Sequence, residues 1–554
     1  MNQVHDFSFE APRPHYYLWH LVAMGVIEAD FVDAHTGAID LAKPRILSTA
    51  WDAINNAYPN AAAQGRIALI DVGVGRKHPN LIGRIDNDLS IDLVTHRYGA
   101  RTVSATAATP YDREATASFF GGLDLQGLSP ITTSAAGTAW LNELVEELAA
   151  SQGVLRTILG TDDTLGSHGT AIAGLAVGEP VLANGEVDAD IGDILSGHPH
   201  IAPGANLSLL PYFGVDPLSQ LVSIRTSFEQ DPAHYIAAFL YAWKIGADVI
   251  LLPRGIPDPV RAALKHKPEL ELDLDKRRNW ERADLFARLH EATPEASELR
   301  PHAVGAVANR DLGWDVLAAL LVAISRSIPI VCAAGNDGES QLIYPASLAA
   351  PDNGIIAVGA VSSAGYRSGY SNYGTGLTLV APSDDGEIHN RHQLRIDRSN
   401  PMVDLHAWTP GTAAVLPYSP LSLLTTDLPG SLGYAEGAEP FSSIFAPYEN
   451  PGLGGGYYTS FGGTSGASAL VGGAAALIAR ANKAKHGETA RLDGPAMKAA
   501  LVSACSQDTV ILPGAIPLAP DPMNADDEAS KGKEYFFGAG LLNVGRAIDA
   551  ILTP

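Results

Sequence analysis

The sequence predicts an α/β fold in which a mostly parallel β-sheet is covered by helices on both faces. Short aliphatic runs alternate along the chain with stretches of helical length, as in βαβ units. Hydrophobic residues make up 46% of the 554 residues, which is enough for a large core and excludes a disordered or collagen-like chain. The sequence also lacks the fixed-period repeat that marks solenoids and propellers.

Six short runs rich in aliphatic residues are expected to form buried strands. In chain order they are residues 66–71 (RIALID), 206–211 (NLSLLP), 247–252 (ADVILL), 328–334 (IPIVCAA), 354–361 (GIIAVGAV) and 377–381 (LTLVA). The segments expected to form helices are residues 233–245, 311–326 and 465–481. This order of elements is typical of a parallel sheet with helical crossovers.

Three longer stretches interrupt this alternation, at about residues 90–165, 257–310 and 383–458. We interpret them as insertions into a single catalytic domain, residues 46–554, which follows an N-terminal arm of residues 1–45. The second stretch interleaves charges of both signs, as a solvated helix pair does. The third is rich in Pro, Gly and Tyr, and three interpretations are open for it: a lid, a binding loop or a disordered segment.

The chain is acidic, with 37 Lys and Arg against 61 Asp and Glu and a formal charge of −24. This balance argues against nucleic acid and anionic membranes as partners, because both require a dense basic surface. The first residues are unlike a signal peptide, and the longest apolar runs are shorter than the roughly 20 residues that span a bilayer. We therefore expect a cytoplasmic location. Cys332 and Cys505 cannot build a disulfide framework, and we interpret both as small buried hydrophobic residues.

Four polar residues lie where catalytic chemistry is expected. Asp71 ends the run RIALID, at the carboxyl end of an expected parallel strand, where open α/β sheets build their sites. His168 in GSHGTAIAGLAVG lies at an expected helix start. Ser465 in FGGTSGAS precedes an Ala/Gly-rich helix, whose N-terminal N–H groups favour developing negative charge. Asn336 in VCAAGN has an amide suited to donate to an oxyanion. Taken singly, each residue also fits a turn, a helix cap or a structural role.

Taken together, the four segments in this chain order resemble the subtilisin-like serine peptidases, the subtilase family. Other segments fit the family pattern in order, and about half of the chain is covered. They include INNAYPNAAAQGRIALIDVGVGRKHPNL, AFLYAWKIGADVILLPRG, IPIVCAAGNDG and the closing GAGLLNVGRAIDA. The resemblance implies a three-layer α/β subtilisin-like catalytic domain carrying the three large insertions.

The resemblance also implies a role for each of the four residues. Ser465 is the expected nucleophile, His168 the general base and then acid, and Asp71 the group that orients the imidazole. Asn336 and the backbone N–H of Ser465 are expected to form the oxyanion hole. The implied activity is that of a serine endopeptidase that forms a covalent acyl-enzyme, with access restricted by the insertions. The alternatives are a catalytically silent or partner-activated scaffold that binds peptides, and a processing protease or transpeptidase dedicated to one precursor.

The substrate-binding run of the family is matched here by Pro253-Arg254-Gly255-Ile256. Gly255 is expected to allow close approach of a peptide backbone. Arg254 is expected to favour acidic or polar substrate side chains, and the alternative is an internal ion pair with a carboxylate of an insertion. Asp337 directly follows Asn336 and is expected to favour a basic residue in the primary pocket.

The implied reaction requires no cofactor. Calcium sites are common in the family, and the candidate residues are Asp86-Asn87-Asp88 and Asp162-Asp163. We predict no metal site, because short acidic runs are usually solvated loops. The expected partners are a protein or peptide substrate and a regulatory protein.

Overall fold

The structure is a computed structural model of the whole chain, and the description below covers the residues whose positions it defines. These are residues 18–30, 45–76, 78–103, 113–157, 166–179, 212–228, 231–257, 310–338, 340–363, 365–384, 423–428, 433–434, 457–510 and 531–553. Within them, no helix is long and apolar enough to cross a lipid bilayer.

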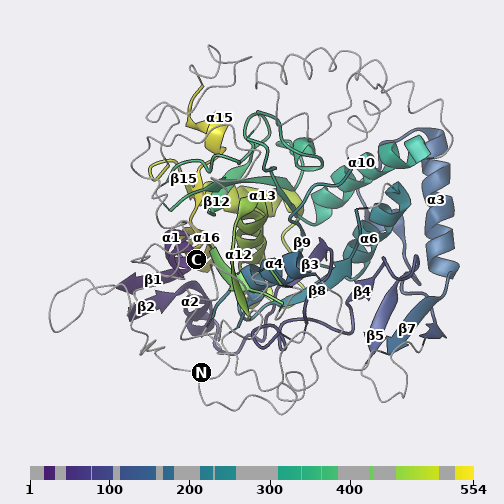
Figure 1. Cartoon of the computed structure of the whole chain (residues 1–554), viewed down its shortest axis with the longest axis horizontal. Coiled ribbons are helices and arrows are strands. Elements are labelled where there is room, and N and C mark those ends of the chain that lie inside the picture. Colours follow the sequence, from purple (N-terminus) through teal and green to yellow (C-terminus); the bar gives the residue numbers. More distant parts are fainter. Residues whose placement is uncertain are drawn as a thin grey trace.

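A twelve-stranded sheet forms the centre of the molecule (Figure 1). Its strands, in spatial order, are β15 (Cys505–Ser506), β16 (Leu541–Leu542), β12 (Leu379–Pro382), β11 (Ile355–Val361), β10 (Ile330–Ala333), β9 (Val249–Leu252), β3 (Arg66–Asp71), β8 (Gln220–Arg225), β4 (Ile91–Asp92), β5 (Ala100–Val103), β7 (Gly153–Thr157) and β6 (Arg113–Thr116). Neighbours from β16 and β12 through to β8 and β4 are parallel, whereas β15/β16, β4/β5 and β6/β7 are antiparallel.

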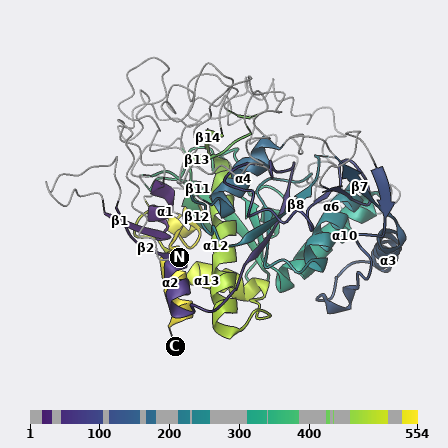
Figure 2. The same cartoon turned by 90° about the horizontal axis from the view of Figure 1, so that it is seen from below.

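Helices cover both faces of this sheet, as Figure 2 shows. One face carries α2 (Ala50–Ala57), α4 (Ser167–Val177), α12 (Gly463–His486), α13 (Gly494–Ser503) and α16 (Val544–Leu552). The other carries α3 (Ala135–Ala150), α6 (Pro232–Lys244) and α10 (Arg310–Ser327). The shorter helices are α1 (Trp19–Ala23), α15 (Lys533–Phe537) and the 3₁₀ turns η1 (Leu125–Gly127) and η3 (Ala346–Leu348).

The core has one hydrophobic cluster on each side of the sheet, because successive side chains of a strand point to opposite faces. In β3, Ile67 and Leu69 pack into the cluster under α4 and α12, while Ala68 and Ile70 pack into the cluster under α6 and α10. All four side chains are fully buried. The predicted three-layer α/β fold is therefore confirmed.

Small residues let α12 lie close to the sheet. A Cβ atom added to Gly472 would lie 2.9 Å from Leu251 of β9, and one added to Gly473 would lie 2.8 Å from the carbonyl oxygen of Ala176 in α4. A larger residue at Gly472 would push α12 away from β9, and one at Gly473 would push it away from α4. The Ala/Gly-rich composition of this helix thus has a packing reason.

Most of the expected elements are confirmed. The strands expected at 66–71, 247–252, 328–334, 354–361 and 377–381 are β3, β9, β10, β11 and β12, with ends that differ by at most two residues. The expected helices are α6, α10 and α12. The strand expected at 206–211 lies outside the described residues. The sequence analysis missed β8, in which half-buried polar residues (Gln220, Ser223 and Arg225) interrupt the buried Leu221, Val222 and Ile224.

The described parts of the proposed insertions are closely joined to this framework. Within residues 90–165, β5, β7 and β6 extend the main sheet and α3 packs against α10. Residues 258–309 of the second stretch lie outside the described residues. The third stretch contains β13 (Leu423–Thr426), which pairs in antiparallel fashion with β14 (Tyr458–Phe461). At the N-terminal end, β1 (Ile27–Asp30) pairs with β2 (Arg45–Thr49).

The two cysteines differ in their surroundings, and neither forms a disulfide. Cys332 is fully buried in β10, and burial raises the pKa of its thiol. Cys505 in β15 is only partly buried, and desolvation raises the pKa of its thiol to about 12. The interpretation as a buried hydrophobic residue is confirmed for Cys332, whereas Cys505 lies at the edge of the core.

Candidate active site

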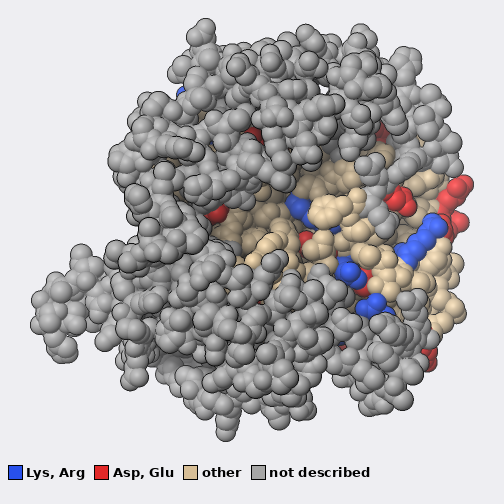
Figure 3. Space-filling model, viewed as in Figure 1, with Lys and Arg blue, Asp and Glu red and all other residues tan. Residues whose placement is uncertain are grey.

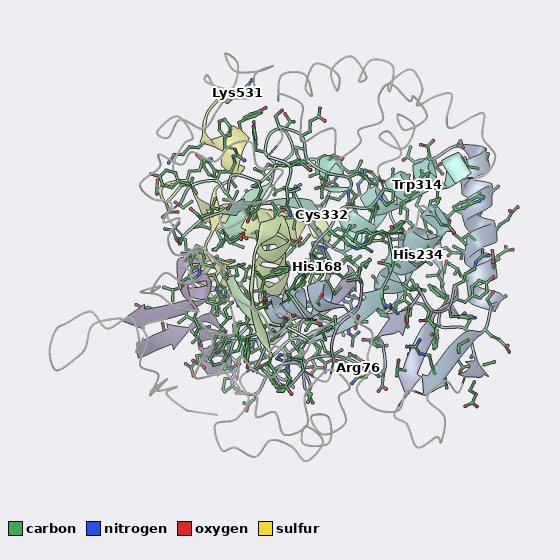
Figure 4. All side chains as sticks on the ribbon, in the orientation of Figure 1. Arg76, His168, His234, Trp314, Cys332 and Lys531 are labelled. Atoms are coloured by element: carbon green, nitrogen blue, oxygen red, sulfur yellow. The ribbon has the colours of Figure 1, made fainter. Side chains whose placement is uncertain are left out.

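Asp71 and His168 meet at the carboxyl edge of the sheet. Asp71 is the last residue of β3, and His168 lies in the first turn of α4, near the centre of the molecule in Figure 4. The carboxylate Oδ2 of Asp71 lies 2.7 Å from Nδ1 of His168, and the two side chains are 1% and 23% exposed. A carboxylate at Nδ1 favours the tautomer in which Nδ1 carries the proton and Nε2 is the acceptor.

Glycine at position 169 allows α4 to approach the loop that follows Asp71. A Cβ atom on Gly169 would lie 2.0 Å from the carbonyl oxygen of Gly73. The Thr170 hydroxyl ties the two segments together, because it accepts from the N–H of Gly75 at 2.8 Å and donates to the Gly166 carbonyl at 2.7 Å. The motif GSHGT therefore positions His168 against the end of β3.

Ser465 lies at the N-terminus of α12, directly beside the end of β9. Its hydroxyl donates to the carbonyl oxygen of Pro253 at 2.7 Å. Within the described residues, Ser465 and His168 share no hydrogen bond. The turn before Ser465 depends on Gly463, whose φ of +73° is a conformation that other residues rarely adopt.

Asn336 follows β10 and is held by Thr464, the residue before Ser465. The Asn336 Oδ1 atom accepts from the backbone N–H of Thr464 at 2.8 Å and from its hydroxyl at 2.9 Å. The same hydroxyl accepts from the N–H of Gly335 at 3.1 Å. These bonds assign the oxygen of the amide and leave Nδ2 as the donor, 3.0 Å from where a Cβ atom of Gly463 would lie.

The sequence analysis missed three residues that hold the turn carrying Ser465. One of them is Thr464, and the only local sign of its role is its position directly before Ser465 in the sequence. The others are Tyr370 and Asp384, which both accept from the N–H of Gly463, at 3.0 and 3.1 Å. The Tyr370 hydroxyl donates to Asp384 Oδ1 at 2.7 Å. Because these two residues lie far from Gly463 along the chain, no local pattern could have indicated their role.

A second histidine, His78, uses both of its ring nitrogens in structural hydrogen bonds. His78 is buried, its Nε2 donates to the carbonyl of Tyr457 at 2.8 Å, and its Nδ1 accepts from the N–H of Asn80 at 3.1 Å. Burial lowers the pKa of His78 to about 4, although the bond to Tyr457 opposes that shift. His78 therefore stays neutral and has no free nitrogen for proton transfer, unlike His168.

Arg254 follows β9, next to the carbonyl that holds Ser465. Its guanidinium donates from Nη2 to the Thr226 hydroxyl at 2.5 Å and the Ser227 carbonyl at 3.2 Å, and lies 4.2 Å from the ring centroid of Phe228. Arg254 is 7% exposed, and its Nε and Nη1 have no hydrogen-bond partner among the described residues. The alternative ion pair with a carboxylate of residues 258–309 falls outside that part of the chain.

The other candidate specificity residues flank Arg254 and Asn336. The backbone N–H of Ile256 donates to the Tyr344 carbonyl at 3.1 Å, and a Cβ atom on Gly255 would lie 3.2 Å from the Ile343 side chain. Asp337 is half-buried in the turn after Asn336, where its backbone N–H donates to Asn372 at 2.9 Å. The preference of Asp337 for a basic residue stays a prediction.

The space-filling view shows the surroundings of the site. Figure 3 shows a hollow near the centre of this face, in the region where Figure 1 places α4 and β9. Its described surface consists mostly of uncharged residues, with a few Lys and Arg side chains and a few Asp and Glu side chains among them.

The calcium candidates that the structure describes, Asp86, Asn87 and Asp88, do not belong to any cluster of potential metal ligands among the described residues. The Asp86 carboxylate accepts from the backbone N–H of Leu89 at 2.9 Å, as a turn residue does. Asp162 and Asp163 lie outside the described residues. In the part of the chain that the structure describes, no group of three or more His, Cys, Asp or Glu side chains is placed to hold a metal ion.

Comparison with known proteins finds relatives of most of the chain. The model of the subtilase family matches residues 64–540. A calcium-dependent protease of Trichormus variabilis is 26% identical over 410 residues, which are 73% of this chain and 43% of that protein. Subtilisin BL of Lederbergia lenta is 41% identical over 81 residues, which are 14% of this chain and 29% of that protein. This chain thus spans less than half the length of these relatives.

Among solved structures, the chain is similar to an epidermin leader peptide processing serine protease from Staphylococcus aureus. The TM-score is 0.44 at 16% identity, over 91% of this chain and 79% of the other. The family model, by contrast, covers most of the chain and includes Asp71, His168, Asn336 and Ser465. The chain belongs to the subtilase family, whose members are serine-type peptidases.

Proposed function

We propose that this chain is an active serine endopeptidase that cleaves peptide bonds through an acyl-enzyme on Ser465. The observation that carries the proposal is the 2.7 Å contact between Asp71 and His168, in a chain whose helix α12 presents a serine at its N-terminus. Asn336 supports it, because Thr464 orients its amide so that Nδ2 is left to donate. These are the groups that acyl transfer to water requires.

The reaction begins when the Ser465 hydroxyl leaves the Pro253 carbonyl and turns toward Nε2 of His168. His168 accepts the hydroxyl proton while Oγ forms a bond to the carbonyl carbon of the substrate. Asn336 Nδ2 and the backbone N–H of Ser465 donate to the resulting oxyanion, and the N-terminal end of α12 adds a favourable dipole.

The second half of the cycle returns the enzyme to its starting state. The imidazolium, stabilised by the Asp71 carboxylate, gives its proton to the amine as the carbon–nitrogen bond breaks. Water then attacks the ester carbonyl while His168 again accepts a proton. The bond between the acyl carbon and Ser465 Oγ breaks, His168 returns the proton to Oγ, and the acid product leaves. Each proton taken by His168 is given back within the cycle, so no external acid or base is consumed.

The Arg254 side chain supports a preference for substrates with a carboxylate near the cleaved bond. A buried cation whose Nε and Nη1 have no partner among the described residues gains most from an anionic ligand. Arg225, by contrast, already forms an ion pair with Asp92 at 2.9 Å and is therefore not expected to bind a substrate carboxylate. Replacement of Arg254 by Ala should remove the preference for Asp and Glu in a peptide library, and Arg254→Lys should retain part of it. Unchanged selectivity in Arg254→Ala would count against this role.

The described residues give no support to a calcium requirement. A relative is named a calcium-dependent protease, but Asp86 is used within a turn and the described carboxylates form no cluster. Calcium needs several clustered oxygen ligands. The proposed mechanism uses only groups of the chain itself, so none of its steps requires a metal ion.

Labelling with a fluorophosphonate probe tests the proposal without knowledge of the substrate. The wild-type protein should be labelled, whereas Ser465→Ala and His168→Ala should not. Ser503→Ala is a matched control, because Ser503 is an exposed serine that bonds only within α13. Folded wild-type protein that resists labelling would favour a silent or partner-activated scaffold. Labelled protein that cleaves a precursor but no unstructured peptide would favour a dedicated processing protease.

A further inference from the structure

A cleft of about 410 Å³ lies where elements from the two ends of the chain meet. Its walls are the turn before β1 with the start of that strand, the junction of β2 with α2, and one side of α16. None of the residues that line it belongs to the candidate active site. In Figures 1 and 2, α2 and the C-terminus lie together at one side of the molecule, whereas α4 lies near its centre. A cleft of this volume is large enough for a small molecule.

Backbone hydrogen bonds hold the walls of the cleft together. The N–H of Val544, the first residue of α16, donates to the carbonyl of Met24 at 2.6 Å. The N–H of Ala50, the first residue of α2, donates to the carbonyl of Val26 at 2.8 Å. The helices α2 and α16 also contact each other. Because the walls are fixed in this way, a ligand does not have to order them, which lowers the entropic cost of binding.

The charged side chains that line the cleft are all carboxylates, namely Glu28, Asp52 and Asp549. Among the described residues, no Lys, Arg or His forms an ion pair with any of the three. Glu28 Oε2 accepts from the Ser48 hydroxyl and Asp52 Oδ2 from the Thr49 hydroxyl, both at 2.7 Å. These donors are neutral, so the negative charges are not cancelled. The cleft therefore favours a cation.

The arrangement of the lining residues indicates what kind of cation fits. In the part of the chain that the structure describes, no three carboxylate, imidazole or thiol groups are placed to share one metal ion. The cleft also has an apolar surface, to which Val26, Ala53 and Ile548 contribute. A chain of amines joined by methylene groups matches both features. Its ammonium groups can each reach a different carboxylate, while its methylene groups contact the apolar side chains.

We infer that this cleft binds a linear aliphatic polyamine, whose ammonium groups pair with Glu28, Asp52 and Asp549. The inference goes beyond the proposed peptidase function and does not depend on it. The bound polyamine contacts β1, α2 and α16 at once, so it links the N-terminal elements to the C-terminal helix. Because only the folded chain has this cleft, binding also stabilises the fold.

Titration calorimetry of the whole chain with spermidine tests the inference. The wild type should bind spermidine at one saturable site, whereas 1,8-octanediol, which is linear but uncharged, should not bind. Glu28→Gln and Asp549→Asn should each weaken the affinity by about 2- to 5-fold, the range for one partly exposed ion pair. The double variant should show the product of the two effects. Both replacements keep the shape of the side chain, and circular dichroism checks that the variants are folded.

A matched control separates this site from general attraction to an acidic protein. Glu143→Gln removes the same charge from an exposed position on α3 and should leave the affinity for spermidine unchanged. An equal loss in Glu143→Gln, or no saturable binding by the wild type, would overturn the inference. Competition by calcium chloride at matched ionic strength provides a second check. Stoichiometric displacement of spermidine by calcium would assign the cleft to a metal ion instead.

Discussion

The hydroxyl group of Ser465 donates its hydrogen bond to the carbonyl oxygen of Pro253, at 2.7 Å. Pro253 directly follows β9, so the serine rests against the end of a central strand. The hydroxyl must leave this carbonyl before it can transfer its proton to His168. In the proposed mechanism, substrate binding therefore both occupies the site and releases the Ser465 hydroxyl from the Pro253 carbonyl.

Replacement of Asn336 by Ala should lower kcat by ~10²–10³, because removal of one oxyanion-hole donor has an effect of this size in subtilisin. KM should change little, because the bond to the oxyanion strengthens only in the transition state. Asn336→Asp is a sharper variant, since it keeps an oxygen for Thr464 but loses the donor. Steady-state kinetics with a fluorogenic peptide measure both values. A larger effect on KM than on kcat would contradict the oxyanion role.

Removal of the Thr464 hydroxyl should disturb the orientation of the Asn336 amide. Thr464→Val has the same shape but loses the bonds to Asn336 and Gly335, so kcat should fall by roughly tenfold, the equivalent of one hydrogen bond. Thr464→Ser keeps the hydroxyl and should restore most of the activity. Equal activity of the Val and Ser variants would show that the backbone N–H of Thr464 alone is sufficient.

Loss of the Tyr370 hydroxyl should destabilise the turn before Ser465. Tyr370→Phe removes a buried donor to Asp384 and an acceptor for the N–H of Gly463. The Gly463 N–H keeps Asp384 Oδ1 as an acceptor at 3.1 Å, whereas the buried Asp384 carboxylate loses the Tyr370 donor, so the free energy of unfolding should fall by about 1–3 kcal/mol. Urea denaturation measures this loss. Tyr366→Phe provides a comparison at a partly exposed tyrosine, and an equal loss there would contradict a specific role for Tyr370.

Acid should destabilise the fold through a buried histidine outside the site. Burial lowers the pKa of His20 to about 3 from a usual 6.5. Below pH 6.5 the unfolded chain binds a proton at His20 that the folded protein excludes. The contribution of His20 to the free energy of unfolding is therefore fully present above pH 6.5 and is lost as the pH falls toward 3. The loss reaches about 2 kcal/mol at pH 5.

The variant His20→Leu tests this explanation. It removes the titrating group, so its free energy of unfolding should fall less steeply between pH 6.5 and pH 5 than that of the wild type. His78, whose pKa is lowered to about 4, contributes in the same direction and remains in the variant. Parallel stability curves for the two proteins would contradict the assignment to His20. Denaturant titrations at several pH values give the comparison.

The α/β class, five strands and three helices could be predicted from the sequence, which also indicated four residues of the candidate site. These features are local: a buried strand is a short aliphatic run, and the segments around Asp71, His168, Asn336 and Ser465 are contiguous motifs. The subtilase resemblance uses the same segments, and the family model bears it out. The chemical role of each of these segments can be inferred from a short contiguous stretch of sequence.

How these residues are held could not be predicted from the sequence, because it depends on contacts between distant parts of the chain. Tyr370 and Asp384 reach Gly463 across 93 and 79 positions of the chain, and Thr425 reaches Ala171 across 254. Likewise, nothing around Tyr434 in the sequence indicates that its ring lies 5.8 Å from that of Phe461. Such contacts join residues that are far apart in the sequence and that only folding brings together. Hydrogen bonds and ring contacts act over a few ångströms in space, whereas a sequence pattern reports only on neighbours along the chain.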